Sequence, residues 1–345
     1  LPGIGRPAQF AGGAHGFSAL PKMLDELMRL YCIDLVHPPL YHALMGVMGL
    51  FGSAEWLLRV PGLLASLGTL VLLWALLRRW SIPAGLTAAF VFAGASPATY
   101  FGQDATPYAA VGLVALASLA LLLRALETGS DRAWWGFFGV LVAGFFLHYN
   151  VALMGIGQVA LLGVLALRGR KDRRWPAAVH RGLRPALILA PLPLLWTWIH
   201  FSTFPTIAQD TRLVADTYAP DPGLASFAWD FTKVTAGVLA NGWGLCAVAG
   251  LLLAALGLAR ALRRGETAPR TLGLFLAVMA LSYFASVLFF YVNVKAGLGG
   301  RVFYGFRWVG WFHPVLLGLG ALGLAAGPAP RLARVALGLV WLVGL

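Results

Sequence analysis

The sequence predicts an all-α, polytopic membrane protein, a bundle of about ten transmembrane helices. Three observations lead to this fold class. The chain is 59% hydrophobic with a mean hydropathy of +0.78. Only 11% of its residues are charged, against about 25% in a typical soluble domain. Apolar runs long enough to cross a bilayer recur along the chain. A soluble fold of 345 residues has too little interior for this apolar surface, so lipid must cover it.

The apolar runs predict the individual spans, because a spanning helix needs about 20 mostly apolar residues. The stretch 133–167 is too long for one helix, and we divide it at His148-Tyr149-Asn150, whose polar groups are costly in hydrocarbon. A shorter run, 38–52, is typical of an interfacial or re-entrant helix. The predicted spans are 59–78, 83–102, 107–126, 133–148, 150–167, 185–202, 238–259, 271–292, 309–327 and 331–345, the last truncated.

The charges predict the orientation of these spans. If 59–78 runs from outside to inside, the inside loops hold 17 of the 26 Lys and Arg but only four of the 13 acids. These loops are 78–82, 124–132, 168–184, 260–270 and 328–334. Such an excess is the positive-inside pattern, with the basic loops in the cytoplasm against anionic lipid. The net charge of +13 therefore needs no nucleic-acid partner.

The chain is predicted to form one transmembrane unit over 1–345. Residues 1–58 form a first extracytoplasmic loop with interfacial helices, and 59–345 form the bundle, with a large outer loop at 203–236. Because the chain starts without Met and ends within an apolar run, we interpret it as a fragment that lacks an N-terminal span. Cys32 and Cys246 have neither metal nor redox spacing.

The first candidate site motif is Asp34-Leu-Val-His37-Pro38-Pro39. Two prolines remove backbone donors and disfavour helix before them, while Pro is tolerated in a first helical turn. We therefore expect Asp34 and His37 at headgroup level, just before an interfacial helix. They are either functional groups or a hydrogen-bonded pair that starts this helix.

A second motif, Gln103-Asp104-Ala-Thr106-Pro107-Tyr108, lies at the outer junction of two predicted spans. Asp104 or Thr106 can cap the helix that follows, and capping alone explains an acid here. The functional alternative is a carboxylate directed into a cavity beneath the outer loops, since an ionisable group at membrane depth suggests a function.

Two more outer segments carry candidate ligands. His148 lies at the predicted outer corner, where it is either a substrate ligand or a hydrogen-bonded interfacial residue. Lys295 and Arg301 bound a Gly-rich stretch. Glycines allow the backbone to approach an anion, and Arg binds phosphate through two parallel bonds. The alternative for this stretch is a solvated loop with interface anchors.

In order along the chain, these motifs resemble those of GT-C glycosyltransferases, in the branch with RgtA/B/C/D-like and protein O-mannosyltransferase-like (glycosyltransferase 39 type) enzymes. Asp34-Leu-Val-His37-Pro38-Pro39-Leu40-Tyr41 resembles the D-x-HPPLYY signature of that branch. Other segments similar to family motifs follow in the same order: 51–55, 58–62, 77–79, 100–109 and 147–149. The resemblance covers about residues 30–150, and Arg301 with Pro314 is loosely similar to a late motif.

The resemblance implies a GT-C-like bundle and inverting transfer of a sugar from a polyprenyl-phosphate donor. The acceptor is a hydroxyl of a glycan, lipid or protein on the extracytoplasmic side of the cell membrane. Asp34 and Asp104 are then the candidates for the catalytic base or a sugar-orienting carboxylate. The expected substrate-binding residues are His37, Gln103, Tyr108, His148, Lys295 and Arg301. No cofactor is expected; some GT-C relatives need a divalent metal, but no acidic cluster in this sequence indicates one.

The sequence departs from the family pattern at two places. No acid precedes Asp25, although the family carries an acidic pair in the first outer loop well ahead of HPPL. That acid either lies upstream of Leu1 or is absent, as in an inactive homologue. Asp104 stands where the family has Glu, and Thr106 replaces an Arg. A transporter or flippase of lipid-linked substrates is the alternative from another class, although mid-membrane polar residues, typical of transporters, are scarce here.

Overall fold

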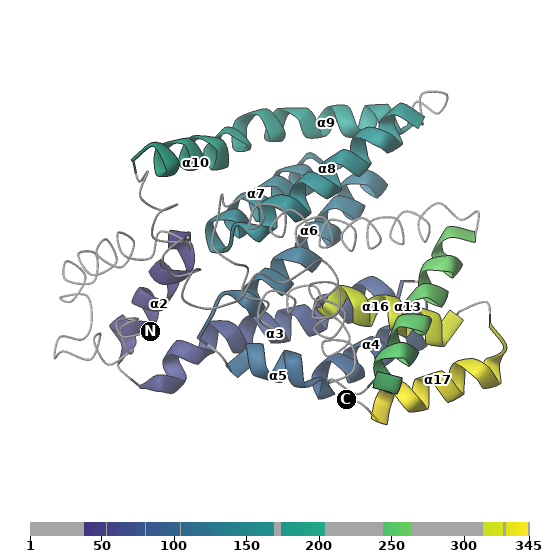
Figure 1. Ribbon diagram of the computed structural model, residues 1–345. Coiled ribbons are helices and arrows are strands. Elements are labelled where there is room, and N and C mark those ends of the chain that lie inside the picture. Colours follow the sequence, from purple (N-terminus) through teal and green to yellow (C-terminus); the bar gives the residue numbers. More distant parts are fainter. Residues whose placement is uncertain are drawn as a thin grey trace, which may run out of the picture.

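The computed structural model describes residues 38–52, 54–79, 81–103, 105–168, 174–203, 244–263, 313–326 and 329–343 (Figure 1). In these ranges all regular secondary structure is helical, as the sequence predicts. The predicted span 271–292 and the predicted outer loop, from residue 204 on, lie outside the described residues.

Two helices begin the described chain. Helix α2 (Pro39–Phe51) starts directly after Pro38, which is extended, and Pro39 is the first residue of the helix. This confirms the short helix predicted over 38–52. Helix α3 (Glu55–Leu77) is the first long apolar helix, and Pro61 lies in its second turn.

The predicted span 83–102 consists of two helices, α4 (Ile82–Gly94) and α5 (Ser96–Gln103). Ala95 between them is extended, with φ −73° and ψ 126°. The break follows from Pro97, because a proline has no N–H to donate and its ring clashes with the carbonyl four residues earlier. The hydropathy of the run is continuous across this point, so it does not reveal the break.

The next three helices follow the predicted spans closely. Helix α6 (Tyr108–Thr128) ends at Gly129, whose φ of +64° is a left-handed helix cap that favours glycine. Helix α7 (Asp131–Leu147) and helix α8 (Asn150–Arg168) are separated at His148, which is extended. The division predicted at the polar triplet is therefore confirmed.

Helices α9 (Arg174–Leu189) and α10 (Pro191–Thr203) follow α8 and are nearly continuous. The sequence analysis treated 168–184 as a loop, but the chain is helical from Arg174. Gly182 and Pro185 are buried, while the intervening Leu183 and Arg184 are exposed. This one-sided burial is the helical pattern that the charge-rich composition of the segment obscured.

The C-terminal helices are α13 (Gly244–Arg263), α16 (His313–Ala326) and α17 (Arg331–Val343). Helices α13 and α16 touch backbone to backbone. A methyl group on Gly257 would collide with the carbonyl oxygen of Leu319, and one on Gly323 with that of Leu253. Small residues at such crossings are how membrane helices approach closely.

The buried core runs through the centre of the bundle. Leu73, Leu119, Phe137, Leu253 and Leu317, from five different helices, are at most 2% exposed. Large apolar side chains also cover the outside of the described bundle, among them Phe90 at 74% and Leu187 at 73% exposure. The described segments long and apolar enough to cross a membrane are Glu55–Leu77, Tyr108–Thr128 and Val179–Ile199.

The helices run back and forth between two ends of the molecule (Figure 1). At one end, Arg79 Nη1 lies 3.1 Å from Glu127 Oε2 and joins the α3–α4 and α6–α7 turns. Arg181 Nη1, on α9, donates to the Gly129 carbonyl over 2.6 Å. We name this the arginine end. Three of the loops predicted to share one side of the membrane thus meet there. We name the opposite end, with the turn between α5 and α6 and the corner at His148, the Tyr108 end.

Candidate functional site

The Tyr108 end is built around the first residue of α6. Pro107 precedes Tyr108 and starts the helix, and both residues are buried. The Tyr108 ring lies 5.7 Å, centroid to centroid, from the ring of Phe101 on α5. On its other side it lies 5.5 Å from the imidazole of His148. Tyr108 therefore connects the end of α5 to the α7–α8 corner.

His148 is held in place by its backbone. It is 6% exposed, its N–H donates to the Gly144 carbonyl over 2.9 Å, and its carbonyl accepts from the Val151 N–H over 3.0 Å. The residue thus ends α7 and begins α8. A methyl group on Gly144 would lie 2.5 Å from Val114 on α6 and 2.8 Å from Val151. The small residue at 144 thus allows the corner to approach α6 closely.

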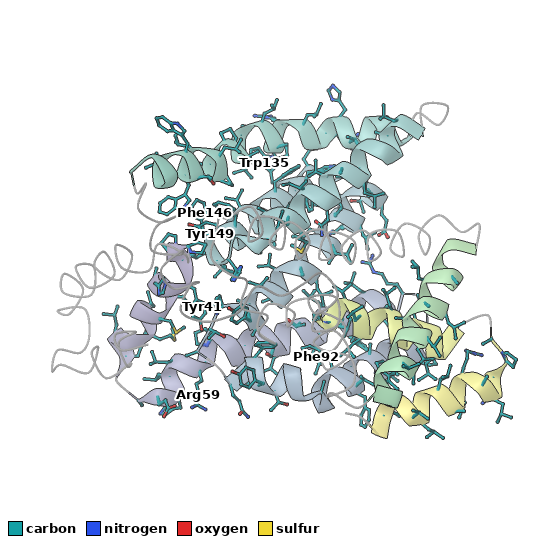
Figure 2. The ribbon with its side chains drawn as sticks, in the orientation of Figure 1. Tyr41, Arg59, Phe92, Trp135, Phe146 and Tyr149 are labelled. Carbon is teal, nitrogen blue, oxygen red and sulfur yellow. The ribbon has the colours of Figure 1, made fainter. Side chains whose placement is uncertain are left out.

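An aromatic group extends this end toward α10. Trp196 Nε1 donates to the Tyr149 hydroxyl over 3.4 Å, and the Trp196 ring meets Phe146 edge to face at 5.5 Å. Phe145 lies 5.2 Å from Tyr149, centroid to centroid. Figure 2 shows Phe146, Tyr149 and Tyr41 at the same end of the molecule. Helix α10 is therefore attached to the Tyr108 end.

A small pocket lies beneath Tyr108 and Phe101, with about 260 Å³ of empty space, part of it open to the outside. Helix α3 contributes the hydroxyls of Ser66 and Thr69, and Thr69 Oγ1 donates to the Ala65 carbonyl over 2.8 Å. The break at Ala95 brings α4 and α5 side chains into its wall. The lining residues are Ser66, Thr69, Phe92, Ala98, Phe101, Tyr108, Ala109, Gly112 and Pro314.

The structure brings two of the predicted site residues into contact, Tyr108 and His148. Gln103 is the last residue of α5, and its side chain is exposed. The other predicted site residues lie outside the described residues: Asp34, His37, Asp104, Lys295 and Arg301.

Charged groups in the described part of the Tyr108 end are few. Arg59 forms an ion pair with Glu55 one helical turn away, and both side chains are largely exposed. Within the described ranges, no group of three or more His, Cys, Asp or Glu side chains is placed to hold a metal ion.

The sequence analysis missed the α3 contribution to the pocket and the Trp196 contact. Ser66 and Thr69 could have predicted this contribution. They are two polar residues three apart in an apolar run, so they lie on one face of the helix. Trp196 has no such signal, because its partner is 47 residues away in the chain.

Comparison with known proteins relates this geometry to membrane enzymes. Residues 36–198 match the family model of dolichyl-phosphate-mannose-protein mannosyltransferases. Two crystal structures of ArnT from Cupriavidus metallidurans share the fold. The structure bound to undecaprenyl phosphate has a TM-score of 0.59 and 17% identity, and the apo structure has 0.55 and 18%. The chain therefore shares its fold with ArnT, and its residues 36–198 are similar to this mannosyltransferase family. No curated protein sequence matches it.

The fold shared with ArnT agrees with the predicted all-helical bundle, and the long apolar helices agree with a multi-pass membrane protein. The alignments cover 88% of this chain but 53% and 51% of the two ArnT chains, so the chain spans about half the length of ArnT. The family match includes His37, Gln103, Asp104, Tyr108 and His148. Asp34, Lys295 and Arg301 fall outside that match.

Proposed function

We propose that this protein transfers a sugar from a polyprenyl-phosphate donor to an acceptor hydroxyl on the extracytoplasmic side of the membrane, with inversion at the anomeric carbon. Two comparisons support a donor of this class. The matching family is named for dolichyl-phosphate mannose, and one similar ArnT structure holds undecaprenyl phosphate. Both lipids are polyprenyl phosphates. The acceptor class is a glycan, a lipid or a protein.

The contact between Tyr108 and His148 is the observation that carries the proposal. These residues come from separate predicted motifs, and Asp104 precedes Tyr108 by four residues in the sequence. A buried imidazole and phenol beside an acidic motif supply hydrogen-bonding groups of the kind that orient a sugar. The pocket directly beneath Tyr108 adds apolar surface to this end.

The proposed reaction needs one base and one cationic group. A carboxylate, Asp34 or Asp104, accepts the proton of the acceptor hydroxyl as its oxygen attacks the anomeric carbon. The bond from that carbon to the phosphate oxygen breaks, and the polyprenyl phosphate leaves with the electron pair. His37, Lys295 and Arg301 are proposed to stabilise the charge that grows on the phosphate.

A transfer assay tests this proposal. The purified protein is incubated with a panel of polyprenyl-phosphate sugars and acceptors, alongside Asp34→Asn and Asp104→Asn. Loss of a general base lowers the rate by about 10²–10⁴-fold, so we expect at least one variant to show this loss. Glu55→Gln is the matched control, because Glu55 is an exposed acid of the same end paired with Arg59. Its rate is expected to stay within about twofold of wild type.

Each other outcome rejects the proposal in a distinct way. A wild-type protein that binds the donor lipid but never transfers the sugar is an inactive homologue. A protein that moves the lipid across the bilayer of a vesicle without transfer is a flippase. Equal losses in Glu55→Gln and the two aspartate variants would show that the aspartates have no special role.

A further inference from the structure

The arginine end carries a group of exposed guanidinium groups that the proposed reaction does not use. They come from the end of α3, the end of α6, the start of α7 and the middle of α9, and all six are exposed. We name the following set the arginine cluster: Arg78, Arg79, Arg124, Arg132, Arg181 and Arg184.

Two contacts hold the segments of the cluster together. Arg79 bridges the α3–α4 turn to Glu127 on α6. Arg181 donates from α9 to the Gly129 carbonyl in the α6–α7 turn. A methyl group on Gly129 would lie 2.5 Å from Arg181 Nη1, so the glycine also leaves room for this contact. Four chain segments are thus fixed beside one another at this end.

Among the described residues, most arginines of the cluster have no acidic partner. Within the described parts of these four segments, the acids are Glu127 and Asp131, and Glu127 is already paired with Arg79. No ion pair involves Arg124, Arg132 or Arg184 among the described residues. The described parts of these segments therefore carry an excess of exposed cationic groups.

The cluster lies where apolar helices end. Helix α3 is apolar up to Leu77, and α6 meets its cap at Gly129. The Arg78 guanidinium lies 4.1 Å from the centre of the Trp74 ring. Trp135, in the second turn of α7, is 37% exposed. Tryptophan at the end of a membrane helix marks the headgroup level. Both tryptophans thus lie beside the arginine cluster, at the ends of apolar helices.

We propose that the arginine cluster is a binding surface for the phosphate groups of anionic phospholipids in the leaflet at that end of the bundle. Guanidinium binds phosphate oxygens in pairs and is more weakly hydrated than ammonium, which suits this task. The segments that carry it are already joined, so little conformational freedom is lost when the lipid binds. This inference does not rest on the proposed sugar transfer.

The test measures lipid binding by the purified protein in neutral detergent. Native mass spectrometry counts bound phosphatidylglycerol and phosphatidylcholine at increasing lipid concentration. The variant Arg124→Gln/Arg132→Gln/Arg184→Gln removes three unpaired cations and leaves the Arg79 and Arg181 contacts intact. We expect the wild type to prefer phosphatidylglycerol and the triple variant to bind it about 100-fold more weakly. Arg59→Gln, an exposed arginine of the Tyr108 end, is the matched control and should bind as the wild type does.

A second measurement uses the wild type alone, so it does not depend on whether the triple variant folds. Binding of phosphatidylglycerol to the wild type is expected to weaken as the salt concentration rises, because exposed charges are screened. Equal binding of both lipids to the wild type, equal loss in Arg59→Gln, or binding that salt does not change would each overturn the proposal. Displacement of the lipid by millimolar inorganic phosphate would also overturn it, since the site would then be one for free phosphate.

Discussion

A buried polar pair joins α6 to α8. Ser118 Oγ donates to the Ala115 carbonyl over 2.9 Å and accepts from Gln158 Nε2 over 3.1 Å. Both residues are fully buried. Gln158 Oε1 has no hydrogen-bond partner among the described residues. The Gln158 amide nitrogen therefore has a partner while its oxygen has none among the described residues. For this reason Ser118 and Gln158 contribute differently to the stability of the protein.

Ser118→Ala is expected to destabilise the protein more than Gln158→Leu does. The first change leaves both ends of a buried amide without a partner and costs about 1–2 kcal/mol. The second removes the unsatisfied oxygen together with the donor, while Ser118 keeps its bond to Ala115, so the unfolding free energy changes by about 0.5 kcal/mol or less. Thermal unfolding in detergent ranks the two variants. The opposite order would contradict the assigned hydrogen bonds.

At the scale of elements, proline and glycine decide where helices break and how closely they pack. Pro97 divides a continuous apolar run into α4 and α5, and Pro191 begins α10 directly after α9. Gly257 and Gly323 allow the backbones of α13 and α16 to touch. The first effect follows from the missing N–H of proline, and the second from the missing Cβ of glycine.

Gly323→Ala is expected to weaken the α13–α16 contact. Its Cβ would collide with a backbone carbonyl, which cannot move aside as a side chain can, so the helices must separate. Overpacking of this kind costs about 1–3 kcal/mol, and a rigid neighbour places this change at the upper end. Thermal unfolding of the variant measures the loss.

Gly163→Ala is the control for that substitution. A methyl group at Gly163 on α8 meets no atom of the described residues within 4 Å. Alanine also favours helix over glycine by about 1 kcal/mol, so this variant should be as stable as the wild type or more so. Equal destabilisation by both alanines would show that the α13–α16 contact is not close.

At the scale of the whole molecule, the two ends differ in charge and chemistry. The arginine end joins three predicted cytoplasmic loops through the Arg79 and Arg181 contacts. The Tyr108 end gathers aromatic rings, His148 and the pocket. The positive-inside pattern then predicts that the arginine end faces the cytoplasm and the Tyr108 end faces outward.

Cysteine labelling in intact cells tests this orientation. In a variant whose Cys32 and Cys246 are replaced by serine, a single cysteine is introduced at Ala54 or at Thr128, both of which are exposed. A membrane-impermeant maleimide should label Ala54→Cys in intact cells and Thr128→Cys only after permeabilisation. Labelling in the reverse pattern would invert the topology and move the proposed site to the cytoplasmic side.

The sequence by itself determined the fold class, most helix boundaries and the candidate motifs. Hydropathy is a local property that a window of about 20 residues captures. The break at His148-Tyr149-Asn150 and the helix start at Pro38-Pro39 were therefore predictable, while the break at Pro97 within a continuous apolar run was missed. The helical start of α9 was missed because its arginines lower the mean hydropathy while its buried face remains regular.

Only the tertiary structure decided which of these elements touch. Tyr108 and His148 were predicted at one membrane level, but their ring contact depends on how closely the α7–α8 corner approaches α6. The pocket needs α3, α4, α5, α6 and α16 together, and Trp196 reaches Tyr149 across 47 residues. Packing between distant segments depends on how the side chains of both segments fit together. A local stretch of sequence shows the side chains of only one of them.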